Sequence, residues 1–292
     1  MLPAPSVIIF SVLSGLGFGL LAYLGAGVVR LAGGAAFVWW GLGYGLAIAG
    51  LMAATFHLGN PKNAVKAFSQ WRTSWLSREA VAAVATLLIL APVALSDWLG
   101  LGWPRLLGYA GAALSLFTVF TTSMIYTQIK AVPRWHHWLN PLMFMGFALA
   151  GGALLAGQGY AAYLLVVLGL LLPAVWRIGD GQFGKAAQTM GTATGLGGIG
   201  EVTVFEQPHT GGNYLMREMI FVVGRKHAQK LRGLALIFSA FLPAAVLFLL
   251  PQAIWVFALA VVCHLTGAFM ARWLFFAEAE HVVGLYYGAR QV

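Results

Sequence analysis

The sequence contains few charged residues, and acidic ones are especially scarce. Only 9% of its 292 residues are charged and 60% are hydrophobic, and 17 Lys and Arg stand against 8 Asp and Glu. Soluble domains carry roughly 25% charged residues, so this composition excludes a soluble protein and indicates an integral membrane protein. In so apolar a chain, the formal net charge of +9 indicates a membrane surface or a protein partner rather than nucleic acid.

Cysteine is almost absent, because Cys263 is the single one and it lies in an apolar run. One thiol cannot form an intrachain disulfide, ligate an iron–sulfur cluster or complete a zinc site. No metal site is therefore predicted on this chain, and any iron–sulfur centre has to belong to another subunit. The N-terminal segment also lacks the basic residues of a signal peptide, so it is predicted to be the first membrane span.

Long apolar stretches predict an all-α integral membrane protein, a single domain over residues 1–292 with eight transmembrane helices. A span needs about 20 mainly apolar residues. The stretches that qualify are roughly 5–29, 34–57, 79–97, 105–128, 137–157, 160–177, 233–252 and 254–276. Glycines recur at close spacing, as in Gly15-Leu-Gly17-Phe-Gly19 and Gly41-Leu-Gly43-Tyr-Gly45, and small residues of this kind allow close helix contact.

Basic residues are concentrated on one side of the predicted bundle. They lie in the loops between spans two and three, four and five, and six and seven, whereas the opposite side has only Arg30 and Arg105. Because loops rich in Lys and Arg stay in the cytoplasm, these loops and both termini are predicted to face the cytoplasm of a bacterium from its inner membrane. The loop residues are Lys62, Lys66, Arg72, Arg78, Lys130, Arg134, Arg177, Lys185, Arg217, Arg225, Lys226, Lys230 and Arg232.

The longest predicted loop, residues 178–232, is expected to contact a partner. Its segment from Met216 to Arg232 has the pattern of a basic amphipathic helix, which could lie on anionic lipid, dock a partner or do both. The predicted docking residues are Lys62, Lys66, Arg217, Arg225 and Lys226. The run from Gly195 to Gly200 matches a dinucleotide-binding fingerprint by its letters, but no strand–helix context surrounds it, so it is predicted to be a turn.

The most specific polar motif lies between the second and third spans. It begins at His57, where the second span ends, continues past Pro61, and includes Trp71, Arg72 and Glu79 where the chain re-enters the membrane. Ionisable groups at a membrane boundary are commonly functional. His57, Arg72 and Glu79 are therefore predicted site residues, whereas the neighbouring lysines are interpreted as an ordinary basic interface.

Two further segments reach the same side of the bundle. Tyr126 ends the fourth span and can donate a hydrogen bond to a carbonyl, although a role in the aromatic belt fits equally well. Arg272 lies within the last span and needs an acceptor, which Glu278 or Glu280 is predicted to supply, either in a structural ion pair or in a site. His264 lies deeper in that span, but no second histidine at matching depth completes the axial ligands of a haem, so haem is not expected.

These motifs resemble the DmsC family, the eight-span anchors of molybdopterin oxidoreductases such as dimethyl sulfoxide reductase. The resemblance is carried by His57-Leu-Gly-x-Pro61, Leu76-Ser77-x-Glu79, Tyr126 and Val132-Pro133-x-Trp135. The sequence is most similar to the branch that contains SoeC, the anchor of a cytoplasmic sulfite dehydrogenase, in residues 69–79, 191–195, 208–215, 225–228 and 272–278. Asn63 stands where the family has an arginine, and Lys62 or Arg72 is expected to supply that cation.

The resemblance implies a molybdopterin catalytic partner and an iron–sulfur partner, which hold the metal centres, and a membrane quinone (ubiquinone or menaquinone) bound by this chain near His57. A histidine with a pKa of about 6.5 can exchange a proton with the quinone at neutral pH. The predicted quinone-binding residues are His57, Trp71, Arg72, Tyr126 and Arg272, and Glu79 is the predicted proton relay. Dimethyl sulfoxide reductase works outside the cytoplasm, so the predicted cytoplasmic orientation agrees with the sulfite dehydrogenase branch.

Three alternatives stay open from the sequence. The first is a dimethyl sulfoxide reductase type of anchor that oxidises quinol. The second is a small-solute or anion transporter, which predicts paired, interrupted spans in its two halves, whereas spans one to four and five to eight are dissimilar. The third is a cytochrome b type of anchor with two haems, which a visible spectrum would reveal.

Overall fold

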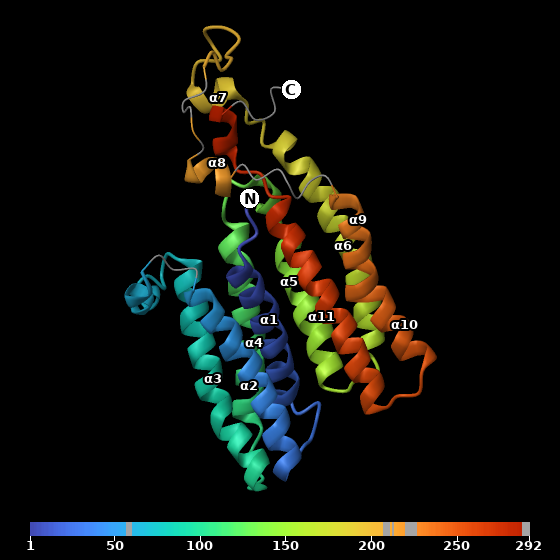
Figure 1. Ribbon diagram of the computed structural model, residues 1–292. Helices are drawn as coiled ribbons and strands as arrows, with labels where there is room; N and C mark the ends of the chain where they lie inside the picture. The colour runs from blue at the N-terminus through green and yellow to red at the C-terminus, as the bar shows by residue number, and fades with distance from the viewer. Residues whose placement is uncertain (57–59, 207–210, 212, 220–226, 288–292) are drawn as a thin grey trace.

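The computed structural model describes residues 1–56, 60–206, 211, 213–219 and 227–287, and these residues form helices and connecting segments without a β-strand (Figure 1). This confirms the predicted all-α class. Seven helices among the described residues are long and apolar enough to cross a membrane. They are α1 (Pro5–Gly25), α2 (Gly33–Thr55), α3 (Trp75–Leu99), α4 (Leu106–Thr127), α6 (Ala161–Lys185), the continuous helix Ala228–Leu249 and α11 (Ile254–Ala277).

The predicted span at 137–157 forms a shorter apolar helix, α5 (Leu139–Leu155), of 17 residues. At 1.5 Å per residue it is about 26 Å long, less than the roughly 30 Å hydrocarbon core of a bilayer. Helix α5 packs against α1, α4, α6 and α11, so it is enclosed by protein. The fifth predicted span is thus present as a helix, but its length falls short of a full crossing.

Helix α1 lies at the centre of the bundle. It contacts α2 and α4 on one side and α5 and α11 on the other, and most of its residues are buried. Helices α1 to α4 form one group, and α5, α6, α11 and the helix Ala228–Leu249 form the second (Figure 1). Because α1 and α5 join the two groups, polar side chains on these two helices face the interior of the protein rather than lipid.

Close helix contacts depend on some of the predicted glycines and not on others. A Cβ atom at Gly17 or Gly19 of α1 would collide with the backbone of α2 or α5, and one at Gly50 of α2 would collide with the backbone of Ser14. A Cβ atom at Gly45 would meet nothing within 4 Å. The spacing of small residues therefore predicted close packing correctly, but which glycines make the contact depends on how each helix is rotated.

The end of the bundle opposite the basic loops is held by one ion pair. The Arg105 guanidinium donates to both oxygens of Asp97, with Nη2 2.9 Å from Oδ1 and Nη1 3.1 Å from Oδ2. Trp40 Nε1 donates to the same carboxylate at 3.0 Å. Since Trp40 belongs to α2, Asp97 to α3 and Arg105 precedes α4, these bonds join three helices at this end.

At the other end, the connection between α6 and the helix Ala228–Leu249 is shorter than the predicted loop of residues 178–232. Helix α6 continues to Lys185, and the next long helix begins at Ala228, formed by α9 (Ala228–Leu236), the π-helical turn η4 (Ile237–Phe241) and α10 (Leu242–Leu249). The described residues do not form the single amphipathic helix that was expected from Met216 to Arg232. Helix α8 (Tyr214–Glu218) ends soon after Met216, and Arg232 belongs to the long helix that begins at Ala228.

The remaining short elements lie at the basic end. They are η1 (Pro61–Phe68), η2 (Pro133–Trp135), α7 (Met190–Thr194) and η5 (Val282–Tyr287). The N-terminal ammonium donates to Ala279 O at 2.5 Å, and Leu2 N donates to Glu218 O at 2.6 Å. These bonds tie the N-terminus to the segment after α11, so that both ends of the described chain meet at the same end of the bundle.

We expect Gly50 and Gly45 of α2 to respond differently to alanine. Gly50→Ala should lower the free energy of unfolding by about 1–3 kcal/mol, because α1 and α2 have to separate to admit the methyl group. Gly45→Ala should leave it unchanged or raise it, since alanine favours a helix by about 1 kcal/mol over glycine. Thermal unfolding of the two purified variants in mild detergent tests this, and equal midpoints would contradict the packing.

Candidate functional site

A buried polar group lies inside the bundle near the basic end. Glu79 stands in the second turn of α3, Thr122 and Tyr126 in the last turns of α4, and Arg272 within the last two turns of α11. Since α3 starts at this end and α4 and α11 finish there, these side chains come to a similar depth. Glu79 and Arg272 are each only 4% exposed, which is unusual for ionisable groups in a membrane bundle.

The Glu79 carboxylate is held by Thr122, whose hydroxyl donates to Oε1. The same hydroxyl also lies 3.0 Å from Thr118 O, its alternative acceptor one turn earlier in α4. The start of α3 is fixed by Ser74, whose side chain caps the helix at Ser77 N. A buried carboxyl with one hydroxyl partner keeps an oxygen available to give or take a proton.

Tyr126 lies in an aromatic cluster formed where α4 and α11 end. Its ring centroid is 5.3 Å from that of Trp135 and 5.4 Å from that of Phe275, and its hydroxyl is within electrostatic reach of both charged groups. Trp135 is held in place because its Nε1 donates to Phe275 O at 2.9 Å. Tyr126 is buried, so it does not belong to an interfacial aromatic belt, the other interpretation that the sequence allowed.

The Arg272 side chain has no carboxylate partner among the described residues. Its Cζ lies 3.5 Å from the ring centroid of Phe144, with Phe147 and Phe275 farther away. Its Nη1 atom is buried and makes no hydrogen bond with the described part of the chain. The aromatic rings offer a cation some attraction through their faces, but they supply no hydrogen-bond acceptor for the guanidinium.

The predicted pairing of Arg272 with Glu278 is wrong. Glu278 instead receives hydrogen bonds from Arg232 Nε and Arg134 Nη2, each at 2.7 Å. Asp180 of α6 joins the same two arginines, with Arg232 Nη2 at 2.7 Å and Arg134 Nη1 at 2.5 Å from Oδ1. We name these four residues, Arg134, Asp180, Arg232 and Glu278, the ion-pair ring. Both carboxylate oxygens of Glu278 accept hydrogen bonds within it. The ring connects η2, α6, α9 and the end of α11.

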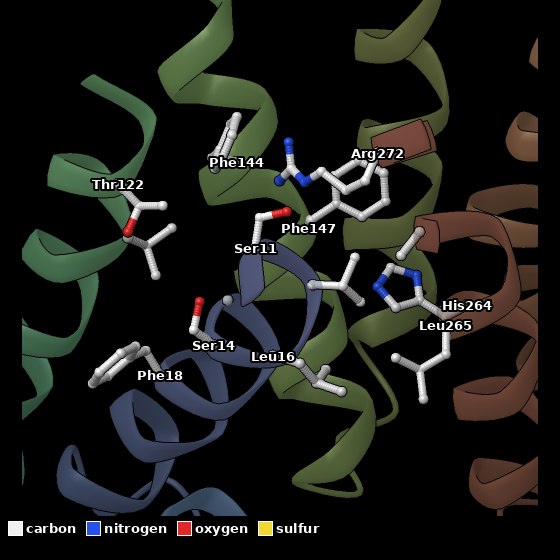
Figure 2. A pocket seen from close by; sticks show the side chains of 14 residues that line it. Ser11, Ser14, Leu16, Phe18, Thr122, Phe144, Phe147, His264, Leu265 and Arg272 are labelled. Carbon is white, nitrogen blue, oxygen red and sulfur yellow. The ribbon is translucent and has the colours of Figure 1, made fainter. Parts of the chain in front are cut away.

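Beside Arg272 there is a small cavity with a volume of about 20 Å³. Figure 2 shows the side chains around it, including Ser11, Ser14 and Thr122, with the guanidinium of Arg272 on one side and His264 deeper along the same helix. A cavity of this size holds about one water molecule. It is too small for a quinone ring, so any such ring has to bind outside it.

The loop residues of the predicted site lie apart from this buried group. Trp71 and Arg72 are exposed, and their turn is held to α3 by Arg78, whose Nε donates to Trp71 O at 3.0 Å and whose Nη2 donates to Arg72 O at 2.7 Å. Lys62 and Lys66 on η1 and Arg217 on α8 are exposed as well. His57, Arg225 and Lys226 lie outside the described residues.

The histidines divide into structural and surface positions. His264 has Nδ1 2.6 Å from Ser239 O in the π-helical turn, so this nitrogen is engaged within the protein. His137 precedes α5 and is buried, and burial together with the neighbouring Arg134 guanidinium lowers its pKa to about 4. His136 is exposed, with Nδ1 2.7 Å from Thr127 O. The adjacent histidines therefore differ in environment.

Sequence reasoning missed three partners at this end. Thr122 holds Glu79, Arg78 holds the Trp71–Arg72 turn, and Asp180 completes the ion-pair ring. Asp180 carried a usable signal, because it is an acidic residue in a strongly basic region. Thr122 had none, since it is one of many hydroxyl residues in an apolar span.

Glu278→Gln should destabilise the folded protein. Two largely buried guanidinium groups would lose a charged acceptor, and breaking a buried ion pair by removing one partner costs about 3–5 kcal/mol. We expect a clear drop in the thermal unfolding midpoint at pH 7 in detergent. Glu201→Gln, which removes an exposed carboxylate, serves as the control and should have no effect. A Glu278→Gln protein as stable as the wild type would contradict the ring's structural role.

The fold and this buried polar group together define a multi-pass membrane protein with ionisable groups inside it. The chain belongs to the family of DMSO reductase anchor subunits (DmsC), whose sequence profile matches residues 5–168. It is 29% identical to the C subunit of the sulfite dehydrogenase of Allochromatium vinosum, in an alignment that covers 98% of this chain and 99% of that protein. No solved structure matches the chain. The protein is thus a membrane anchor of a molybdoenzyme.

Proposed function

We propose that this chain is the quinone-reactive anchor of a heterotrimeric molybdopterin oxidoreductase. It passes electrons between an iron–sulfur partner and the membrane quinone pool, with sulfite oxidised by the catalytic partner in the cytoplasm. Family membership supports the anchor role, and the name of the Allochromatium vinosum relative supports sulfite as the electron source. The molybdopterin and the iron–sulfur clusters belong to the partners, since this chain has one cysteine.

The observation that carries the quinone proposal is the buried group of Glu79 and Arg272 at the basic end. A buried guanidinium with a free Nη1 atom is poised to donate to an oxygen that carries negative charge. A buried carboxyl near the start of α3 can exchange a proton. Both properties fit a quinone, which gives or takes two electrons together with two protons when bound.

Each residue then has a chemical task. Glu79 holds and relays a proton, and Thr122 orients its carboxyl group. Tyr126 and Arg272 stabilise negative charge on the head group, Tyr126 through its hydroxyl and Arg272 through its fixed positive charge. Because the cavity beside Arg272 holds only about one water molecule, these two residues are proposed to act on the head group through their electrostatic field from inside the bundle, without direct contact.

The quinone ring itself is proposed to lie at the membrane boundary, between the turn of Trp71 and Arg72 and the start of α3. Trp71 offers an exposed aromatic face and Arg72 a cation, and Arg78 fixes the turn that carries them. His57, which precedes this loop in sequence, is proposed as the direct ligand and proton acceptor. A quinone can enter this place from the lipid without crossing the bundle.

The basic end is proposed to face the cytoplasm of a bacterium, where the partners assemble. The loops at this end hold nearly all the basic residues of the chain, and Lys62, Lys66 and Arg217 are exposed there. Together with Arg225 and Lys226, these residues are proposed to contact the partners or anionic lipid. A quinol-oxidising anchor of the dimethyl sulfoxide reductase type is the second candidate, favoured by the family profile, and it would place this end outside the cytoplasm.

Two charge-removing substitutions test the site. We expect Glu79→Gln and Arg272→Gln each to lower quinone-dependent turnover of the purified complex at least tenfold, because each removes a group that stabilises or moves charge in the reaction. His57→Ala should abolish that turnover. In all three variants, oxidation of sulfite with a soluble artificial acceptor should continue at the wild-type rate, because the catalytic partner is untouched.

Arg105→Gln is the matched control. It also removes a partly buried arginine, but at the opposite end of the bundle, so it should affect thermal stability and leave the KM for quinone unchanged. If Glu79→Gln and Arg272→Gln turn over quinone as fast as the wild type, the quinone site lies elsewhere. If sulfite gives no activity with any acceptor, sulfite is not the partner's substrate.

A further inference from the structure

The connection after α7 forms a loop that lies beyond the ends of the long helices. We name residues Gly195–Glu206 the outer loop. In Figure 1 it is the amber segment farthest from the bundle, on the same side as the N-terminus. The basic end, and with it the proposed partner-binding side, is therefore where this loop projects from the protein.

The outer loop exposes large apolar side chains to its surroundings. Phe205 is fully exposed, Ile199 is 86% exposed and Leu196 is about half exposed. Exposed leucines or phenylalanines are ordinary on helices that face lipid, but this loop lies past the helix ends. A cluster of exposed apolar residues outside the membrane commonly marks a surface that another molecule covers.

The base of the outer loop is well defined. Gly197 N donates to Gly191 O at 3.2 Å, and the two glycines approach so closely that a Cβ at either would crowd the other's Cα. Thr189 and Thr192 form a capping box at the start of α7. Gly195 has a φ of +72°, a left-handed conformation that ends α7 and suits glycine. The loop thus presents its apolar residues from a fixed base.

A second contact fixes α7 to the C-terminal part of the chain. The Tyr286 hydroxyl in η5 donates to Ala193 O at 2.5 Å, and Asn213 Nδ2 donates to the Tyr287 hydroxyl at 3.0 Å. Because η5 follows the end of α11, the outer loop is linked to the helix that carries Arg272. A preorganised element loses little conformational freedom on binding, which favours affinity.

The charge of the outer loop differs from that of the rest of this end. Its only charged residues are Glu201 and Glu206, whereas the surrounding loops are strongly basic. Anionic lipid head groups would repel two carboxylates, so the loop is poorly suited to lie on the membrane surface. A protein surface with an apolar pocket and basic residues at its rim would match both features of the loop.

We propose that the outer loop is a docking element for the water-soluble subunit that contacts this anchor, with Ile199 and Phe205 inserted into an apolar pocket of that subunit and Glu201 and Glu206 facing basic residues around it. This inference rests on the proposed assembly with soluble partners. It adds an apolar, acidic contact to the basic docking residues, and it commits to a protein rather than a lipid as the occupant.

Photo-crosslinking in the intact complex tests the contact directly. Phe205 is replaced by p-benzoylphenylalanine in cells that produce all the subunits, and Trp255, an exposed aromatic residue at the start of α11 and thus at the opposite end, is replaced in the same way as a control. We expect a product with a soluble subunit from position 205 and none from position 255. A product with lipid only, or no protein product at position 205, would overturn the proposal.

Loss of affinity provides the second measurement. Ile199→Ser with Phe205→Ser should reduce retention of the soluble subunits on membranes about tenfold or more, because a few apolar anchors supply most of the binding energy of an interface. Leu106→Ser, equally apolar and exposed at the far end, should retain them fully. Since the exposed side chains make no core contacts, unfolding midpoints should match the wild type.

The outcomes separate this inference from the proposed function. If the wild-type chain retains soluble subunits and the double variant retains them equally well, only the docking role of the outer loop is overturned. If the wild-type chain retains no soluble subunit under conditions that preserve membrane complexes, the assembly itself is overturned, and the docking role falls with it.

Discussion

The cost of placing charge inside an apolar bundle governs the arrangement of this protein. A charge at the centre of a bilayer is unfavourable by several kcal/mol or more unless water or an opposite charge compensates it. Accordingly, Asp97 and Arg105 neutralise each other at one end, and the four members of the ion-pair ring do so at the other. Two buried groups are exceptions among the described residues. Glu79 is held by the Thr122 hydroxyl and by no opposite charge. The guanidinium of Arg272 is buried and has no carboxylate partner in the part of the chain that the structure describes.

The exception at Arg272 has a direct bearing on function. Glu278, six residues farther along the chain, does not neutralise Arg272, because it is already bonded to Arg134 and Arg232. The surrounding structure therefore keeps the Arg272 guanidinium without a carboxylate partner, because it directs Glu278 to other arginines. Residues that break a general rule of stability while their neighbours obey it are commonly functional, and this supports Arg272 as part of the proposed quinone site.

Much of the architecture could be predicted from the sequence, and the reasons differ from element to element. Helix positions follow from apolar length, which is a local property, and the basic loops share one end because spans alternate in direction. The pairing of Arg272 with Glu278 could not be judged, because a charge's partner depends on which helices adjoin it. The same holds for Glu79, which was predicted as a site residue, since its partner Thr122 comes from another helix and was not foreseen. The glycines of α2 likewise show what depends on tertiary structure. Their spacing is visible in the sequence, but the rotation of α1 and α2 about their axes decides that Gly50 contacts the backbone of α1 and that Gly45 does not.

The basic end thus concentrates three features that an electron-transferring anchor needs to keep together. The outer loop and the exposed basic residues are proposed to face a soluble partner, the ion-pair ring fixes the helix ends beneath them, and the buried group of Glu79 and Arg272 lies just below the level of that ring in the bundle. In the proposed complex, electron transfer requires the partner's cluster to come close to the quinone, which a rigid end favours. The ion-pair ring provides this rigidity because it joins four separate elements through charged hydrogen bonds, which are stronger and more directional than apolar contacts.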